Sequence, residues 1–208
     1  MSRTASAIAV TALSLLLLFL SACGPSAPTR FYLLNSLAGP DLGKREAAVQ
    51  PRVTIGIGPV KLPAYLDRQQ IVTRINENEL HLAEFDVWAE PLKDNLTRVL
   101  VENLNALLSE GAFDAIPFGA VTQIDYQVEV EVIRMDGSLG GTASLIARWT
   151  VFKRQGREML LTRTSSLREP ASGPDYEALI AAQSRTVEAL SREVADAIQG
   201  PSIKKGNP

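Results

Sequence analysis

Apolar and polar side chains alternate most regularly between residues 124 and 132. The apolar positions there are Ile124, Tyr126, Val128, Val130 and Val132, and the polar ones are Asp125, Gln127, Glu129 and Glu131. A period of two predicts a strand with one buried face, one wet and acidic face, and an antiparallel neighbour. Residues 143–151 and 158–167 predict two more strands, joined by turns at 136–141 and 155–156.

Two longer segments repeat apolar residues at the spacing of a helix. The first follows Pro91, which suits a first helical turn, and Gly111 is expected to cap its C-terminus. Its apolar stripe is Leu92, Leu96, Val99, Leu100, Leu104, Leu107 and Leu108. The second segment begins near Pro174 and stops at Gly200. Its stripe is Tyr176, Leu179, Ile180, Gln183, Val187, Leu190, Val194 and Ile198.

Short apolar runs before the first helix predict further strands at 31–34, 53–57, 71–75 and 80–88. Residues 61–68 predict an ordered loop or a single helical turn. The order of strands, helix, strands and helix predicts a single α+β domain. In it, two amphipathic helices pack on one face of a mixed, mostly antiparallel sheet.

The N-terminus carries a second kind of pattern. Residues 8–20 form an uncharged apolar run, which Arg3 precedes and Cys23 follows. This order is typical of a bacterial lipoprotein signal peptide, in which the cysteine becomes acylated. A transmembrane anchor fits less well, because a span needs about 20 apolar residues and Ser14 interrupts this run. An ordinary secretory signal needs no cysteine, and Gly24 in place of Asp favours the outer membrane.

These patterns divide the chain into four parts. We predict a lipoprotein signal peptide over 1–22, a lipidated tether over 23–29, one domain over 30–200 and a polar tail over 201–208. The chain has 21 basic and 23 acidic residues and a net charge of −2, which gives no electrostatic case for binding nucleic acid. Cys23 is the only cysteine, so no disulfide framework is expected.

The residue chemistry argues against catalysis. His81 is the only histidine, it is predicted at a turn edge, and no spacing of carboxylates supports a zinc site around it. The glycine-rich segment 136–141 lacks the Gly-Lys-Ser/Thr ending of a nucleotide loop. We therefore predict no enzyme, no metal and no cofactor. Asp125, Glu129 and Glu131 share a strand face, which is either a solvated surface or an acidic docking strip.

One region resembles a known family. Residues 55–74 read IGIGPVKLPAYLDRQQIVTR, and residues 87–92 read VWAEPL. Together with FYLL at 31–34 and RVL at 98–100, they resemble the ABC-type transport auxiliary lipoproteins, the PqiC/YmbA-like group. The likeness covers most of the chain after the cysteine. Val87 stands where the family usually has Arg, and Gln69 stands where it usually has Pro.

The resemblance implies an outer-membrane, periplasm-facing lipoprotein that serves as accessory subunit of an MCE-type intermembrane lipid transport system. Such a protein docks the periplasmic assembly at the membrane and supports envelope integrity. The implied partners are an MCE-domain protein and the associated inner-membrane transporter subunits, and a homo-oligomer is compatible with this role.

Aromatic residues and arginines are favoured at the centre of interfaces. We therefore expect the partner contact at Tyr65, Leu66, Asp67, Arg68 and Trp88. These residues also have a structural interpretation, in which Tyr65 and Leu66 plug the sheet edge and Trp88 packs on the helix start. Two other functions stay open. One is a stand-alone lipoprotein that binds a lipid or small molecule in its own pocket, and the less favoured one is an envelope hydrolase.

Overall fold

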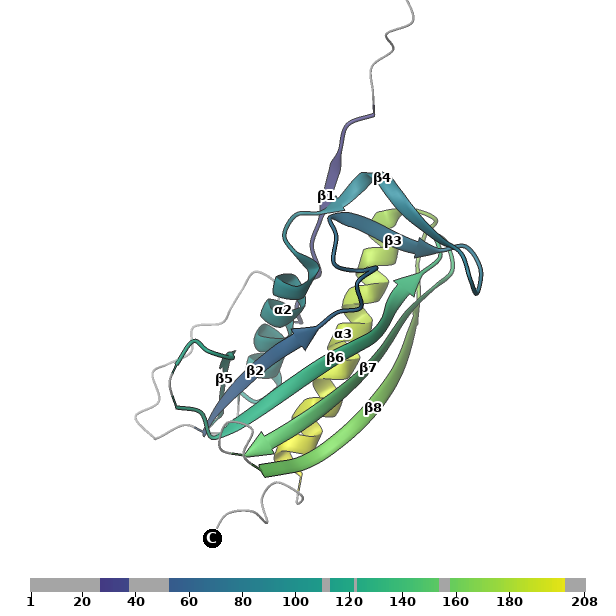
Figure 1. Ribbon diagram of the computed structural model, residues 1–208. Helices are drawn as coiled ribbons and strands as arrows, with labels where there is room; N and C mark the ends of the chain where they lie inside the picture. Colours follow the sequence, from purple (N-terminus) through teal and green to yellow (C-terminus); the bar gives the residue numbers. More distant parts are fainter. Residues whose placement is uncertain (1–26, 38–52, 110–112, 122, 154–157, 201–208) are drawn as a thin grey trace, which may run out of the picture.

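The computed structural model describes residues 27–37, 53–109, 113–121, 123–153 and 158–200. Two helices and two mixed sheets, of three and five strands, form one α+β domain (Figure 1). The predicted fold class is therefore confirmed. Cys23, the segment before it, most of the tether, Gly111, residues 155–156 and the tail 201–208 lie outside the described residues.

The larger sheet has the strand order β5-β2-β6-β7-β8. Its strands are β2 (Val53–Lys61), β5 (Phe113–Pro117), β6 (Tyr126–Gly137), β7 (Thr142–Lys153) and β8 (Glu158–Pro170). Strands β6, β7 and β8 form an antiparallel meander, as the alternating pattern predicted. Strand β2 runs parallel to both of its neighbours, β5 and β6.

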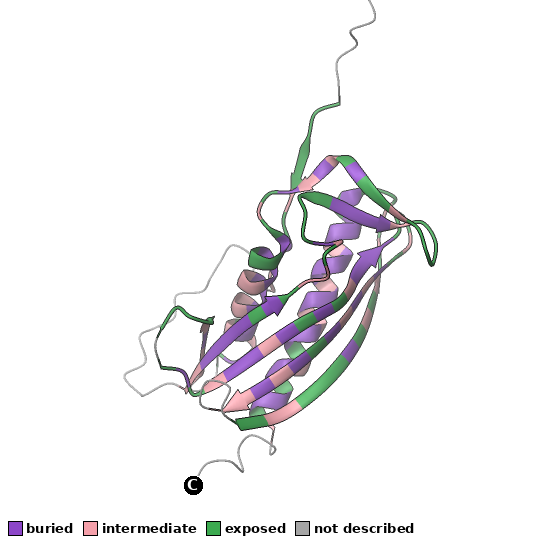
Figure 2. Ribbon diagram, in the orientation of Figure 1, coloured by how far each residue is buried: buried purple, intermediate pink, exposed green. Residues whose placement is uncertain are grey.

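Both helices, α2 (Leu92–Leu107) and α3 (Tyr176–Gln199), pack on one face of this sheet (Figure 1). Their apolar stripes meet the inward residues of the strands, so the core lies between the helices and the sheet (Figure 2). Trp149 at the centre of β7 is fully buried, and its indole N–H donates to the Ser165 hydroxyl at 2.9 Å. A buried Trp needs such an acceptor for its polar end.

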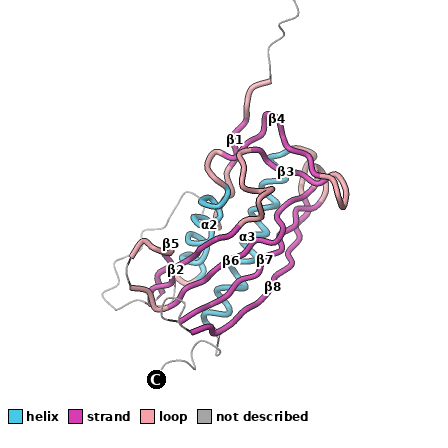
Figure 3. Tube along the Cα trace, viewed as in Figure 1, coloured by secondary structure: helices cyan, strands magenta, loops and turns pink. Residues whose placement is uncertain are grey.

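The smaller sheet has the order β1-β4-β3 and lies at one end of the molecule (Figure 3). It contains β1 (Arg30–Tyr32), β3 (Gln70–Arg74) and β4 (Leu80–Trp88). Strand β4 is central, parallel to β1 and antiparallel to β3. The division into two sheets was not predicted from the pattern of short strands.

Two features of the larger sheet differ from the prediction. Strand β5 was not predicted, because it is short and ends in proline. Strand β6 continues through Asp136 and Gly137, and the turn is confined to Ser138–Gly141, where Gly140 has a φ of 69°. Asp136 stays in the strand with its side chain fully buried, because two arginines neutralise it.

The polar face of β6 is also less wet than its alternation predicted. Gln127 is only 3% exposed, and its amide donates to the Gly58 carbonyl at 2.9 Å. Glu131 is exposed and pairs with Arg148 on β7 at 2.9 Å. Asp125 is exposed and accepts a hydrogen bond from the backbone N–H of Thr54 at 2.7 Å. Glu129 accepts a hydrogen bond from the Gln127 amide at 3.3 Å, so all three acidic side chains have local partners.

Candidate functional site

The segment between β2 and β3 forms the ordered turn that its sequence predicted. The Leu66 N–H donates to the Pro63 carbonyl at 2.9 Å, and the Arg68 N–H donates to the Leu66 carbonyl at 2.9 Å. Leu66 is 3% exposed and belongs to the core, whereas Asp67 and Arg68 point to solvent. We call residues 65–68 the docking turn, and its exposed part is Asp67 and Arg68.

The burial of Leu66 corrects its place among the expected contact residues. Trp88 also belongs to the core and is 6% exposed. Both were candidate contact residues with a structural alternative, in which they pack within the domain, and both belong to its hydrophobic core. The structural interpretation therefore describes Leu66 and Trp88 better than an open contact surface does.

Tyr65 is half-buried and faces a charged cluster. Burial raises the pKa of its hydroxyl, and the negative charge of Asp136 raises it further. The positive charge of Arg74 opposes this rise in the pKa of Tyr65, and its guanidinium donates two bonds to Asp136 at 2.7 and 2.9 Å. Tyr65 thus lies in the electrostatic field of the ion pair that joins β3 and β6.

A small pocket brings the exposed part of the docking turn next to Trp88. Its volume is about 230 Å³, and Asp67, Arg68 and Gln69 line it on one side. Residues Trp88, Ala89, Glu90, Pro91 and Leu92 line the other side. Trp88 therefore contributes to the pocket wall, and the charged lining residues are Asp67 and Arg68 of the turn and Glu90 after β4.

Strand β4 connects this pocket to the N-terminal strand. On one edge, Tyr32 of β1 pairs with Trp88, and the Ala89 N–H donates to the Tyr32 carbonyl at 2.9 Å. On the other edge, the Trp88 N–H donates to the Gln69 carbonyl at 2.8 Å, and Gln70 pairs with Val87. The strand that leads to the N-terminus and the docking turn thus flank the same end of β4.

Side chains also fix β1 to β4. Asp86 is 5% exposed and accepts hydrogen bonds from Tyr32 at 2.8 Å and from Arg30 at 3.0 Å. Burial, followed by the hydrogen bond to Asp86, raises the pKa of Tyr32 to about 12. The Leu34 N–H continues the attachment by donating to the Asn95 side chain of α2 at 2.8 Å.

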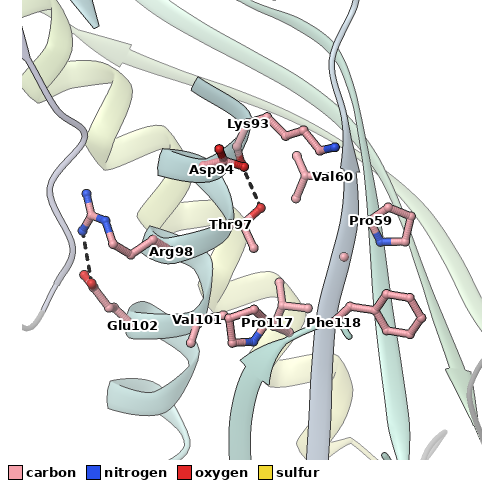
Figure 4. A pocket seen from close by; sticks show the side chains of 12 residues that line it. Pro59, Val60, Lys93, Asp94, Thr97, Arg98, Val101, Glu102, Pro117 and Phe118 are labelled. Carbon is pink, nitrogen blue, oxygen red and sulfur yellow. Dashed lines mark hydrogen bonds and ion pairs between the residues drawn. The ribbon is translucent and has the colours of Figure 1, made fainter. Parts of the chain in front are cut away.

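A larger cleft of about 550 Å³ lies between α2 and the edge of the larger sheet (Figure 4). Its floor is mainly apolar and combines Pro59 and Val60 of β2, Val101 of α2, and Pro117 with Phe118 after β5. Phe118 is 44% exposed at its edge. The sequence pattern did not indicate this cleft, because β5 and the residues after it form one wall.

Charged side chains of α2 surround the mouth of the cleft. Arg98 pairs with Glu90 and Glu102, each at 3.1 Å. The pKa of Glu90 is lowered, first because the Asn95 amide donates to it and also because Arg98 lies beside it. Lys93 extends across the mouth towards Val60 (Figure 4). The mouth therefore carries both signs of charge over an apolar floor.

Comparisons with known proteins identify the family. The model of the ABC-type transport auxiliary lipoprotein component family matches residues 32–195. The chain belongs to this family. The resemblance predicted from residues 55–74 and 87–92 is thereby confirmed. A comparison with curated proteins returned no match.

Two solved structures share the fold of this auxiliary lipoprotein. One, described as an uncharacterized protein, is 18% identical with a TM-score of 0.68, and the match covers 83% of this chain and 99% of that one. Protein XCC0632 from Xanthomonas campestris is 20% identical with a TM-score of 0.58, and the match covers 82% and 91%. At these identities the likeness extends to the fold alone.

His81 lines neither the pocket beside the docking turn nor the cleft beside α2. His81 is exposed on β4. Within the described ranges, no three or more His, Cys, Asp or Glu side chains gather where they could hold a metal ion. Neither helix of the described part is long and apolar enough to cross a bilayer. The pocket beside the docking turn and the cleft beside α2 are candidate binding sites.

Proposed function

We propose that this auxiliary lipoprotein is a non-catalytic docking subunit of an MCE-type intermembrane lipid transport system. It is acylated on Cys23, held at the outer membrane and facing the periplasm. There it binds an MCE-domain protein, through which it works with the inner-membrane transporter subunits and supports envelope integrity. Its contact surface is the exposed part of the docking turn, Asp67 and Arg68, with the pocket behind it.

The observation that carries this proposal is the arrangement around the end of β4. The strand that follows the lipid tether occupies one edge of β4, and the docking turn leads into the strand on the other edge. The strand that follows the tether and the strand that follows the docking turn thus belong to one sheet. A site held next to a bilayer has a raised effective concentration for a partner that arrives at the same bilayer.

The length of the tether supports the same role. Residues 24–29 separate Cys23 from the first residue of β1. Six fully extended residues reach about 20 Å, so the domain stays close to the membrane. Arg68 at the mouth of the pocket is the kind of side chain that forms the energetic centre of an interface.

Site-specific crosslinking in membranes tests the proposal. Arg68 is replaced by the photoreactive residue p-benzoylphenylalanine, and the matched control carries it at Arg148, which is 52% exposed on the open face of the larger sheet. We expect an MCE-domain protein to crosslink at position 68 and not at position 148. Acylated protein that yields no MCE-domain partner from position 68 would refute the docking role.

The cleft beside α2 favours a second candidate function, the binding of a lipid chain or small apolar molecule. Its volume of about 550 Å³ and mainly apolar floor fall within the range of ligand sites, about 300–1,000 Å³. Native mass spectrometry tests this function on protein extracted from membranes. A bound adduct that Thr97→Trp removes by filling the cleft would support it, and bare wild-type protein would exclude it.

A further inference from the structure

Strand β1 carries an apolar surface on the face opposite to Asp86. Phe31 is 69% exposed, the largest exposed fraction among the large hydrophobic side chains that the structure describes, and Leu33, which follows the end of β1, is 41% exposed. Phe31 pairs in register with Val87, and Phe85 lies two residues earlier on the same face of β4. Both β4 residues are half-buried. We call Phe31, Leu33, Phe85 and Val87 the apolar end patch.

The apolar end patch is held in place from behind. Arg30 and Tyr32 point to the other face of β1, and both bind the Asp86 carboxylate. Just after the strand, the Leu34 backbone is fixed to Asn95. Because successive side chains of a strand point to opposite faces, these contacts hold Phe31 outward. Burying Phe31 within the domain would require breaking them.

The length of the chain before β1 indicates what lies opposite the patch. Phe31 follows Cys23 by eight residues, which span at most about 29 Å when fully extended. Strand β1 also lies at the end of the molecule from which the N-terminal chain leaves, far from the start of β8 (Figure 1). If Cys23 carries the lipid anchor, the nearest apolar phase to Phe31 is the bilayer itself.

We propose that the apolar end patch contacts the lipid bilayer, with Phe31 entering the boundary between headgroups and acyl chains. This inference rests on the acylation of Cys23 in the proposed function. Aromatic and aliphatic side chains bind at this boundary. This contact is a second point of attachment to the membrane, besides the acyl chains. It gives the domain one orientation on the membrane, so that the domain does not rotate freely about its tether.

Fluorescence quenching by brominated lipids tests the contact. The mature, acylated protein is reconstituted into phosphatidylethanolamine and phosphatidylglycerol vesicles with brominated acyl chains. Phe31→Trp places an indole in the patch, and Met159→Trp is the matched control, because Met159 is 66% exposed at the start of β8. After subtraction of the wild-type emission, we expect a blue shift and loss of most emission at position 31. Emission at position 159 should be unchanged.

Vesicle flotation separates this inference from the proposed function. Protein that floats while the indole at position 31 stays unquenched overturns the bilayer contact and leaves acylation intact. A blue shift without quenching indicates a protein occupant, such as a second copy of the chain, and also overturns it. Protein that does not float lacks the anchor, which overturns the acylation and the bilayer contact together.

Discussion

Neutralising Asp136 should destabilise the domain, because this carboxylate joins the two sheets. It lies on β6, is fully buried, and accepts hydrogen bonds from Arg74 on β3 at 2.7 and 2.9 Å and from Arg134 at 2.8 Å. Asp136→Asn keeps the size of the side chain and removes its charge. Two partly exposed arginines then lie beside a neutral amide.

The expected cost follows from the exposure of the partners. Removing one member of a fully buried ion pair costs about 3–5 kcal/mol. The side chain of Arg74 is 20% exposed and that of Arg134 is 37% exposed, so water solvates part of the positive charge that remains. We therefore expect Asp136→Asn to lower the free energy of unfolding by about 2–3 kcal/mol.

Equilibrium unfolding in urea, on protein expressed from residue 24 onward, measures this loss. The matched control is Glu131→Gln on the same strand, whose ion pair with Arg148 has side chains 51% and 52% exposed. Such an exposed pair contributes about 0–1 kcal/mol. The pKa of Tyr65 should also fall in Asp136→Asn, because the Asp136 charge raises it. Equal losses in the two variants would refute the role assigned to burial.

Three further predictions concern the helices and β1. Asp175 caps α3 by accepting a hydrogen bond from the Ala178 N–H at 2.8 Å, so Asp175→Ala should cost about 1 kcal/mol in thermal unfolding, and Asp175→Asn clearly less. Asn95→Leu leaves the buried Leu34 N–H without its acceptor, so hydrogen exchange at that amide should accelerate, whereas Asn78→Ala in the β3–β4 hairpin should leave it unchanged. The pKa of Tyr32 is raised from 10 to about 12. The protonated Tyr32 hydroxyl therefore stabilises the folded state fully below pH 10, and this stabilisation is lost as the pH rises to about 12. Ultraviolet titration of tyrosinate should show this shift, and Asp86→Asn should reduce it.

The sequence predicted those helices and strands in which buried positions recur at a regular spacing. The alternation from Tyr126 to Val132 identified β6, because Val128, Val130 and Val132 are all buried in the core. Helices α2 and α3 were also predicted, because each buries one apolar stripe. Strand β5 was missed, since five residues ending in Pro117 contain too few alternations to be distinguished from a loop.

Burial of polar and aromatic residues depended on contacts that a local pattern does not contain. Asp136 appeared to belong to a turn because its partner Arg74 is 62 residues away in the sequence. Leu66 and Trp88 were candidate contact residues, because an apolar side chain beside charged residues in the sequence is compatible with a core and with a contact surface. Only the packing of the docking turn against the end of β4 distinguishes the two cases.

The position of β4 explains why the expected contact region remains the best candidate after two of its five residues proved to be buried. Trp88 binds the Gln69 carbonyl with its backbone N–H and pairs with Tyr32 on the opposite edge. Its indole fills the space behind the docking turn, so it determines where Arg68 lies relative to β1. The hydrogen-bonded sheet therefore sets the distance from β1 to Asp67 and Arg68, the contact surface proposed above. A partner that must receive lipid at the bilayer needs such a fixed distance, which a docking site on a loose loop would not provide.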